Sequence, residues 1–374
     1  MNDEAAKKKF KWWKIPVIVL AAAVLIVAGY LSYVFITYSR IEDNVKLDVT
    51  DGVRGETADS GSADVKPAIG TEYTIVTYNV GFGAYTPDFT FFMDGGKESR
   101  AKSKQSVIDC TDGAMNVAKQ YGADIVLYQE VDTDSDRSYH VNQCEMFKDG
   151  FSDYDSVFAV NYHSAYLMYP ITRPHGKSNS GIQTLSKFDI DSALRRRLPV
   201  ADGVQKILDL DRCYSISRIP TENGRELVIF NTHLSAYGTD ESLSNAQLDM
   251  IFADMEKEYK AGNYVIMGGD LNHDFTGDSV GLLNNGEEST LSWTVPLSDD
   301  SVPEGFKKCE NYADGLVPSA RDNDIPYGPD SFTVVIDGFI ISDNIECTYV
   351  QNIDTGFGYS DHNPVVMKFK LKAN

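Results

Sequence analysis

Short apolar runs recur along the chain, and several of them lead directly into a polar side chain. The clearest run covers residues 264–267 and precedes Gly268-Gly269-Asp270-Leu271-Asn272. Runs of this length that are rich in Val and Ile are typical of strands buried on both faces of a sheet. The same pattern predicts strands at 74–80, 124–130, 155–161, 182–185, 192–198, 206–210, 213–220, 226–233, 332–341 and 365–370.

Two longer segments repeat their apolar residues at helical spacing. Residues 104–121 and 243–259 therefore predict amphipathic helices. Residues 275–331 are polar and rich in glycine, with weak periodicity. We expect a long connection there, with one short strand at 291–295.

The N-terminal segment has the composition of a membrane anchor. Five lysines within the first 14 residues precede an uncharged apolar run at 15–35, which is long enough to span a bilayer as a helix. Lysines on this side predict a cytoplasmic N-terminus, with the remainder of the chain outside the cell. A cleaved signal peptide is the alternative, but the run is longer than a usual signal core and shows no convincing cleavage site.

This segmentation gives four parts. Residues 1–14 form a basic cytoplasmic tail, 15–35 a transmembrane helix, 36–70 a linker and 71–374 the folded domain. The linker assignment depends on residues 50–61, where Gly, Ser, Asp and Thr dominate and apolar periodicity is weak.

The folded part is strongly acidic. The formal net charge of the chain is −21, and residues 1–40 carry six Lys or Arg against two Asp or Glu, so the remainder carries −25. Proteins that grip nucleic acid non-specifically are usually basic, so nucleic acid is a disfavoured but open partner. The five cysteines include no C-x-x-C pair, and they predict neither a zinc site nor a disulfide framework.

Asp270 and Asn272 combine two functions that phosphate chemistry needs. Residues two apart point to the same side of an extended chain. The carboxylate holds or accepts a proton, and the amide donates a hydrogen bond to a phosphate ester or an attacking water. Taken alone, Asp-x-Asn after a strand is usually a turn, so the assignment depends on the rest of the chain.

Other predicted strands also carry reactive side chains. Asn79, Glu130 and His233 each lie at a strand end, where an ordinary solvated or hydrogen-bonded role is the simpler interpretation. Asp337 lies within the run 332–341, and a buried carboxylate needs a partner. His362 supplies one, because a nearby Asp337 would hold its imidazole in one tautomer and raise its basicity.

Two loops have distinctive compositions. Residues 82–93 are aromatic, and form either a lip facing substrate or membrane or a cluster folded back on the core. Residues 162–181 form a cationic loop in an acidic domain. We take His163, Arg173, Lys177 and Asn179 from it as candidate substrate-binding residues for a phosphate or polar head group, with an ordinary solvated loop as the alternative.

The ordered set of strand-end residues, and above all Gly-Asp-x-Asn with the terminal Ser360-Asp361-His362, resembles the endonuclease/exonuclease/phosphatase superfamily. That group includes secreted DNase I-type nucleases, abasic-site endonucleases, inositol polyphosphate 5-phosphatases and neutral sphingomyelinases. The resemblance covers residues 71–374. It implies a DNase I-like four-layer α/β/β/α sandwich, in which two mixed sheets pack face to face and strand-end loops form the cleft.

The resemblance also implies roles for individual residues. Glu130 resembles the main metal ligand, with Asn79 beside it and Asp361 completing a site for Mg²⁺ or, alternatively, Mn²⁺ or Ca²⁺. Asp270 and Asn272 would position the water or the transition state. His233 would donate to a phosphoryl oxygen. His362, oriented by Asp337, would be the general base, although the Asp270 equivalent is the alternative base.

The resemblance implies a hydrolase that cleaves a phosphodiester by in-line attack of water. A phospholipid or sphingolipid head group, an extracellular nucleic acid and a small phosphoester are the open substrates. A phosphomonoesterase of the inositol-phosphatase type and a catalytically silent surface-binding module are the alternatives. We expect a monomer at the cell membrane, with its catalytic domain outside.

Overall fold

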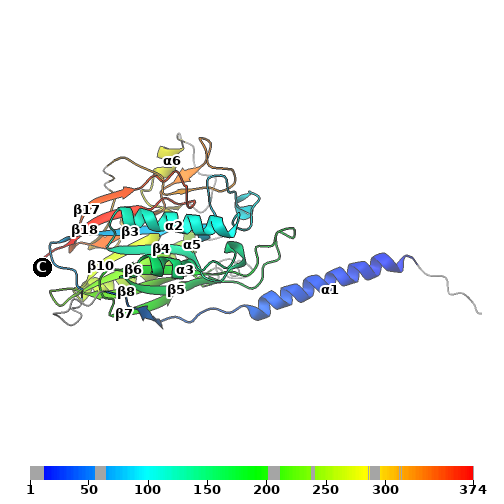
Figure 1. The fold of residues 1–374 in the computed structure, drawn as a ribbon, viewed down its shortest axis with the longest axis horizontal. Helices are drawn as coiled ribbons and strands as arrows, with labels where there is room; N and C mark the ends of the chain where they lie inside the picture. The colour runs from blue at the N-terminus through cyan, green and yellow to red at the C-terminus, as the bar shows by residue number, and fades with distance from the viewer. Residues whose placement is uncertain are drawn as a thin grey trace, which may run out of the picture. The chain divides into compact units, whose positions relative to one another are not determined.

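Two seven-stranded mixed sheets form the centre of the unit Arg40–Asn374 (Figure 1). The first sheet has the order β1 (Val45–Leu47), β7 (Ser192–Arg197), β8 (Cys213–Pro220), β9 (Glu226–His233), β10 (Tyr264–Asp270), β16 (Asp337–Ser342) and β13 (Phe306–Lys308). The second has the order β17 (Ile345–Asn352), β18 (Val365–Leu371), β3 (Glu72–Asn79), β4 (Ile125–Asp132), β6 (Asn179–Ser186), β5 (Asp155–His163) and β2 (Val49–Thr50). Two short ladders pair β11 (His273–Asp274) with β12 (Val295–Pro296) and β14 (Ala320–Arg321) with β15 (Thr333–Val334).

This computed structural model describes residues 12–54, 65–200, 211–236, 241–284, 286, 295–310, 312 and 314–373. A separate N-terminal unit, Met1–Ser39, contains the helix α1 (Lys14–Thr37). Its 24 residues have a mean hydropathy of 2.5 in their most apolar window, which is enough to cross a membrane. A signal sequence near the N-terminus would have the same character, so α1 is compatible with either role.

Alternation of side chains along the strands divides the core into layers. In β10, Tyr264 and Ile266 belong to the core between the sheets, whereas Val265 and Met267 belong to the core on the outer face. Strand β4 alternates in the same way between the central core and the outer face of the second sheet. Successive residues of a strand point to opposite faces, so a strand covered on both faces reads as a continuous apolar run.

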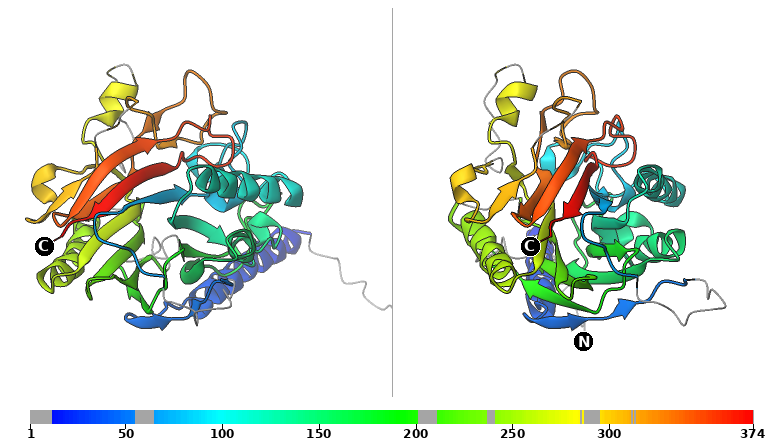
Figure 2. Two further views of the ribbon diagram at one scale, coloured as in Figure 1. Left: turned by 60° about the vertical axis from the view of Figure 1, so that its left-hand side comes forward. Right: turned by 90° about the vertical axis from the view of Figure 1, so that its left-hand side faces the viewer.

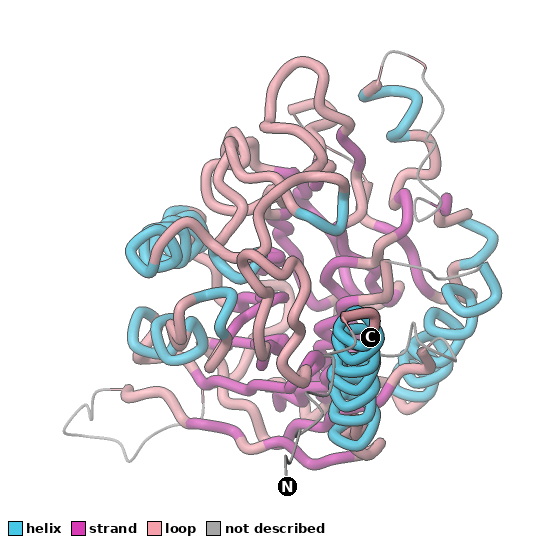
Figure 3. The backbone as a smooth tube through the Cα atoms, turned by 90° about the vertical axis from the view of Figure 1, so that its right-hand side faces the viewer, coloured by secondary structure: helices cyan, strands magenta, loops and turns pink. Residues whose placement is uncertain are grey.

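Helices cover both outer faces. The helices α2 (Lys104–Gln120) and α3 (Gln143–Gly150) pack on the second sheet, and α5 (Glu241–Lys260) packs on the first. Figures 2 and 3 show helices on both sides of the stacked strands. The structure therefore confirms the four-layer α/β/β/α sandwich and the two predicted long helices. A short helix, α6 (Ser279–Leu283), follows β11.

The predicted linker is wrong over part of its length. Strand β1 pairs with β7 at the edge of the first sheet, and β2 pairs with β5 at the edge of the second. The folded unit thus begins at Arg40 and not at residue 71. These strands were missed because edge strands are short and half-exposed, so their apolar pattern is weak.

Several predicted strands differ in detail. The run 332–341 is not one strand, because β15 ends at Val334 and β16 begins at Asp337. Strand β4 does not end at Glu130 but continues to Asp132 through a bulge. Strand β17 and the edge strand β13 were not predicted, and the predicted strand 206–210 and most of 291–295 lie outside the described residues.

A buried arginine joins three segments at one corner of the fold. Arg195 of β7 is 1% exposed. Its guanidinium donates to the carbonyl oxygens of Val160 at 2.9 Å, Glu42 at 3.2 Å and Asp211 at 2.6 Å. These acceptors belong to β5, to the segment before β1 and to the segment before β8, so one side chain fixes the relation between the two sheets here.

We expect Arg195→Met to lower the free energy of unfolding by about 3 kcal/mol, because three buried carbonyl groups lose their donors. Arg197→Met is the matched control, since Arg197 is exposed on the same strand, and we expect it to change stability by no more than about 0.5 kcal/mol. Urea unfolding of the detergent-solubilised full chain measures both. Equal stability of the two variants would show that Arg195 does not hold this corner.

Candidate active site

The strand ends that carry the predicted side chains meet at one edge of the sandwich. Strands β9 and β10 are parallel and place His233 opposite Asp270, and β16 is antiparallel to β10 and begins with Asp337 opposite Asp270. In the second sheet, parallel pairing of β3 with β4 brings Asn79 close to the bulge at Glu130. Parallel strands end at the same edge of a sheet, so residues far apart in the sequence converge here.

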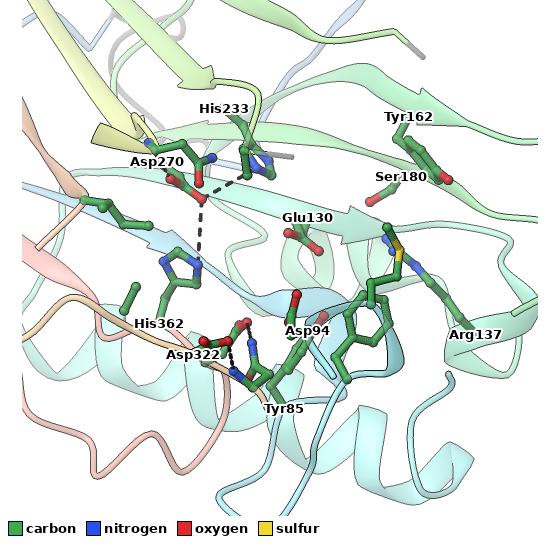
Figure 4. A pocket seen from close by; sticks show the side chains of 18 of the residues that line it. Tyr85, Asp94, Glu130, Arg137, Tyr162, Ser180, His233, Asp270, Asp322 and His362 are labelled. Atoms are coloured by element: carbon green, nitrogen blue, oxygen red, sulfur yellow. Dashed lines mark hydrogen bonds and ion pairs between the residues drawn. The ribbon is translucent and has the colours of Figure 1, made fainter. Parts of the chain in front are cut away.

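Asp270 lies at the centre of this cluster (Figure 4). Its Oδ2 accepts a hydrogen bond from Asn79 Nδ2 at 2.9 Å. The same oxygen lies 3.5 Å from His233 Nε2 and 3.7 Å from His362 Nε2. The other oxygen, Oδ1, accepts from the backbone N–H of Asn272 at 3.0 Å. One buried carboxylate thus gathers side chains from both sheets.

His362 is oriented by a second buried carboxylate. Its Nδ1 lies 2.8 Å from Asp337 Oδ2, which also accepts from the Ser319 hydroxyl at 2.8 Å. Asp337 is 0% exposed, so its charge must be balanced locally. The bond to Asp337 makes Nδ1 the protonated nitrogen and turns Nε2 toward Asp270, which is the arrangement expected from the sequence.

The two groups have displaced pKa values. Burial raises the pKa of Asp270 to about 7, although His362 opposes this shift. Burial alone would lower the pKa of His362, but the carboxylates of Asp337 and Asp270 raise it to about 10. Near neutral pH the imidazole is therefore a charged donor, and Asp270 is the group able to take up or release a proton.

His233 is a neutral donor beside this pair. Burial lowers its pKa well below the usual value, and the nearby Arg212 and His362 add to the shift. Its Nδ1 has no hydrogen-bond partner among the described residues. A buried imidazole nitrogen left without a partner suits a site that binds a polar group. Asn272 also lines the cleft; its Nδ2 donates to the Leu234 carbonyl at 2.8 Å, and its backbone is left-handed with φ 49°.

Glu130 projects from β4 because the strand bulges there. The register shifts between Tyr128 and Val131, and Glu130 has φ 54°, a conformation that is uncommon for residues other than glycine. The bulge turns its carboxylate into the cleft. Burial raises the pKa of Glu130; Arg137 opposes this shift, and Asp361 adds to it.

The carboxylates of Glu130 and Asp361 both line the cleft and interact electrostatically, and carboxylate oxygens suit a hard divalent cation. Mg²⁺ usually takes one or two carboxylates and keeps several waters. Asp361 is held for this by the amide of Asn323 at 2.8 Å and the hydroxyl of Ser360 at 3.2 Å. Asn79 differs from the expected ligand, because its Nδ2 faces Glu130 Oε1 at 3.5 Å while its Oδ1 accepts from the Gly81 N–H.

A second group, Asp270 with Asp337 and His362, also has ligand atoms within 4.8 Å of one another. It fits a metal less well than the carboxylate pair. Without a metal, the carboxylates of Asp337 and Asp270 raise the pKa of His362, so a metal bound here would have to displace a proton from its imidazole. The charge of the histidine already balances the two carboxylates.

The cleft around these groups has a volume of about 160 Å³. Arg137, Arg212 and Arg321 contribute cations to its lining. Its other lining residues include the aromatic and apolar side chains Tyr85, Phe91, Phe92, Met93, Tyr162 and Leu167. In Figure 4 the cluster of Asp270, His233 and His362 lies at one end, with Arg137 and Tyr162 at the other. The cleft is thus longer than a phosphate group alone requires.

The four candidate substrate-binding residues do not line this cleft. His163 pairs with Asp211, and Arg173 donates to the Ala101 carbonyl and the Tyr139 hydroxyl, both at 2.9 Å. Lys177 is exposed, and Asn179 donates to the Thr133 hydroxyl at 2.7 Å. The loop is cationic as predicted, but His163, Arg173 and Asn179 hold neighbouring segments and Lys177 faces solvent.

Sequence reasoning missed Arg137, which does reach the cleft. Its guanidinium forms two hydrogen bonds to Asp132, at 3.0 and 2.9 Å, and lies 3.9 Å from the centre of the Phe82 ring. The aromatic loop is mixed in character. Phe82 and Phe89 are buried in its own small core, as the core interpretation expected, whereas Phe92 and Met93 line the cleft. No pattern in the sequence distinguished these two roles.

Solved structures share this fold at low sequence identity. An endonuclease/exonuclease/phosphatase from Beutenbergia cavernae aligns with a TM-score of 0.53 and 16% identity over 81% of this chain and 72% of that chain. TDP2 from D. rerio, complexed with a single-strand DNA product, gives 0.52 and 13% over 80% and 99%. ANGEL2, a 2′,3′-cyclic phosphatase complexed with adenosine-2′,3′-vanadate, gives 0.54 and 14% over 88% and 99%.

No curated protein sequence is significantly similar to the chain, but a family model does match it. The model described as the endonuclease/exonuclease/phosphatase family matches residues 76–362, which include the whole cluster from Asn79 to His362. Because this match spans well over half of the sequence, the chain belongs to the endonuclease/exonuclease/phosphatase family of phosphoester hydrolases.

Proposed function

We propose that this protein is a divalent-metal-dependent phosphodiesterase whose hydrolytic site is centred on Asp270. The observation that carries the proposal is the convergence of Asn79, His233 and His362 on one carboxylate oxygen, next to the Glu130–Asp361 pair. A silent binding module would have no need to bury so many coupled ionisable groups, because each is costly unless it is paired.

Glu130 and Asp361 would hold the metal, with Asn79 orienting Glu130. Mg²⁺ is the best match for two carboxylates and water, and Mn²⁺ or Ca²⁺ would suit the same oxygen ligands. When bound, the ion would neutralise charge on the phosphate and polarise its oxygens.

The side chains then divide the remaining work. Asp270, with a pKa of about 7, accepts the proton of the attacking water. His362, charged and held by Asp337, donates to a phosphoryl oxygen on which negative charge develops. His233 and Asn272 add neutral donors. The raised pKa of His362 therefore supports Asp270 as the general base, the alternative to the role first expected for the histidine.

The length of the cleft supports a diester over a monoester. A diester carries a substituent on each side of phosphorus, and the cleft extends from the catalytic cluster to Arg137 and Tyr162. The charge of −25 on residues 41–374 disfavours a long nucleic acid. With α1 as a membrane anchor and the lysines before it on the cytoplasmic side, the domain would work outside the cell as a monomer.

The proposal is tested by hydrolysis of bis-p-nitrophenyl phosphate by the detergent-solubilised full chain. We expect activity with Mg²⁺ that EDTA abolishes, and we expect Asp270→Asn to lower kcat by about 10²–10⁴-fold because the proton acceptor is lost. The melting temperature of this variant checks that the fold is kept. Wild-type turnover in Asp270→Asn would remove Asp270 from the mechanism.

Metal binding can be measured without turnover. Calorimetric titration of EDTA-treated protein with MgCl₂ should show at least about tenfold weaker binding in Glu130→Gln, because one of two charged ligands is removed. Asp322→Asn is the matched control, since Asp322 also lines the cleft but lies outside the proposed ligand set. Equal loss of affinity in both variants would point to general electrostatic attraction in place of a defined site.

The pH profile should reflect both displaced groups. We expect kcat/KM to rise as pH passes about 7, where Asp270 loses its proton, and to fall as pH passes about 10, where His362 loses its own. Asp337→Asn removes the nearest negative charge, so the alkaline limb should move by about one pH unit or more toward lower pH. An unmoved alkaline limb would mean that His362 is not the group that titrates there.

A further inference from the structure

One loop beside the cleft exposes apolar side chains. Tyr166, Met168, Tyr169 and Ile171 lie between β5 and β6, and the last two are 68% and 82% exposed. Among the described residues of the unit Arg40–Asn374, only six other large apolar side chains are exposed, and no four of them lie together in one segment. We call residues 166–171 the rim loop. Contiguous exposed apolar groups of this kind mark interaction surfaces.

The rim loop forms one edge of the cleft. Leu167, within it, lines the cleft, and the Tyr169 ring lies 5.7 Å from the ring of Phe92, which also lines the cleft. Met93, next to Phe92, is 39% exposed and lines the cleft from the same side. Whatever the rim loop binds is therefore held at the entrance of the active site.

The charges around the rim loop would permit contact with an anionic surface. No Asp or Glu occurs from residue 156 to residue 188, in a domain that is otherwise strongly acidic. Within this stretch Arg173 and Lys177 are exposed next to the loop. Segments that expose apolar side chains next to cationic ones can insert into the head-group region of a bilayer.

A short segment of chain connects this corner of the domain to α1. The backbone N–H of Ile41 donates to Asp211 Oδ1 at 2.7 Å, and the other oxygen of Asp211 pairs with His163, the last residue of β5. The rim loop begins three residues later. Ile41 is only four residues beyond the end of α1 at Thr37, and four extended residues span at most about 14 Å.

We propose that the rim loop and Met93 insert into the bilayer that holds the N-terminal helix, and that the active site takes a lipid phosphoester from that bilayer. The lipid substrate rests on the proposed phosphodiesterase function, whereas insertion does not. The connection of four residues favours a membrane over a soluble protein partner, because a chain of this length limits the distance between Ile41, which bonds to Asp211, and a bilayer that holds α1.

Insertion is tested on the full chain in vesicles of brominated phosphatidylcholine with anionic phosphatidylglycerol. Trp12, Trp13 and Trp293 are replaced by Phe, and a single tryptophan is placed by Ile171→Trp. Insertion by about 5–10 Å should reduce its fluorescence by about twofold relative to unbrominated lipid.

Val53→Trp in the same background is the matched control. Val53 is 81% exposed, against 82% for Ile171, and its N–H bonds to Ser152 near the opposite end of β5. We expect no quenching there. Equal quenching at both positions, or none at Ile171→Trp, would overturn the proposal and leave a soluble partner as the occupant of the rim loop.

The substrate is tested by the ratio of two rates, hydrolysis of phospholipid in the same vesicles over hydrolysis of bis-p-nitrophenyl phosphate. Tyr169→Ser combined with Ile171→Ser should lower this ratio about tenfold, because access to bilayer lipid is lost while the cleft is kept. Val53→Ser should leave both rates unchanged.

An unchanged ratio in the double variant would overturn the lipid substrate. Failure of the wild-type protein to cleave either compound would instead refute the proposed function, and the quenching result would still decide insertion.

Discussion

The structure depends on keeping one carboxylate, that of Asp270, buried and usable. A carboxylate removed from water is costly unless donors and opposite charge surround it. Asn79 of the second sheet donates to it, and His233 and His362 lie close to the same oxygen. Because these partners come from both sheets, the contact at Asp270 requires the two sheets to pack in one register.

The buried carboxylate of Asp270 has a second buried carboxylate, that of Asp337, beside it. It lies opposite Asp270 in the β10–β16 ladder, where two like charges would repel. His362 lies between them, 2.8 Å from Asp337 and 3.7 Å from Asp270, and its positive charge balances both. The same arrangement that makes the charges tolerable in the interior separates their pKa values, which is the condition for acid–base chemistry near neutral pH.

The outer part of the cleft is built on a different principle. Arg137 is paired with Asp132 and lies against the Phe82 ring, so a charged wall is fixed by structure buried behind it. Beyond it, Phe92 and the rim loop form an apolar edge. A cleft that is charged at its base and apolar at its entrance suits a lipid substrate that carries a phosphate. The short connection to α1 would keep the domain near a bilayer that holds this helix.

The sequence by itself determined most of the strands at the centre of the two sheets, the two long helices and the identity of the side chains at the strand ends. Runs such as 264–267 are apolar because both of their faces are covered, and that pattern is local. The ordered set from Asn79 to His362 was sufficient to predict the family and the four layers, since most of these residues lie at or near the end of a strand that could be recognised.

Only the tertiary structure decided which of these side chains meet, and how. The bulge that turns Glu130 into the cleft depends on neighbours far along the chain. So do the hydrogen bonds that Arg173 donates to the Ala101 carbonyl and the Tyr139 hydroxyl. The edge strands β1 and β2 gain their order from pairing and not from their own short pattern. The protonation of His362 is decided in the same way, because it depends on carboxylates 25 and 92 positions away whose distance only the fold establishes.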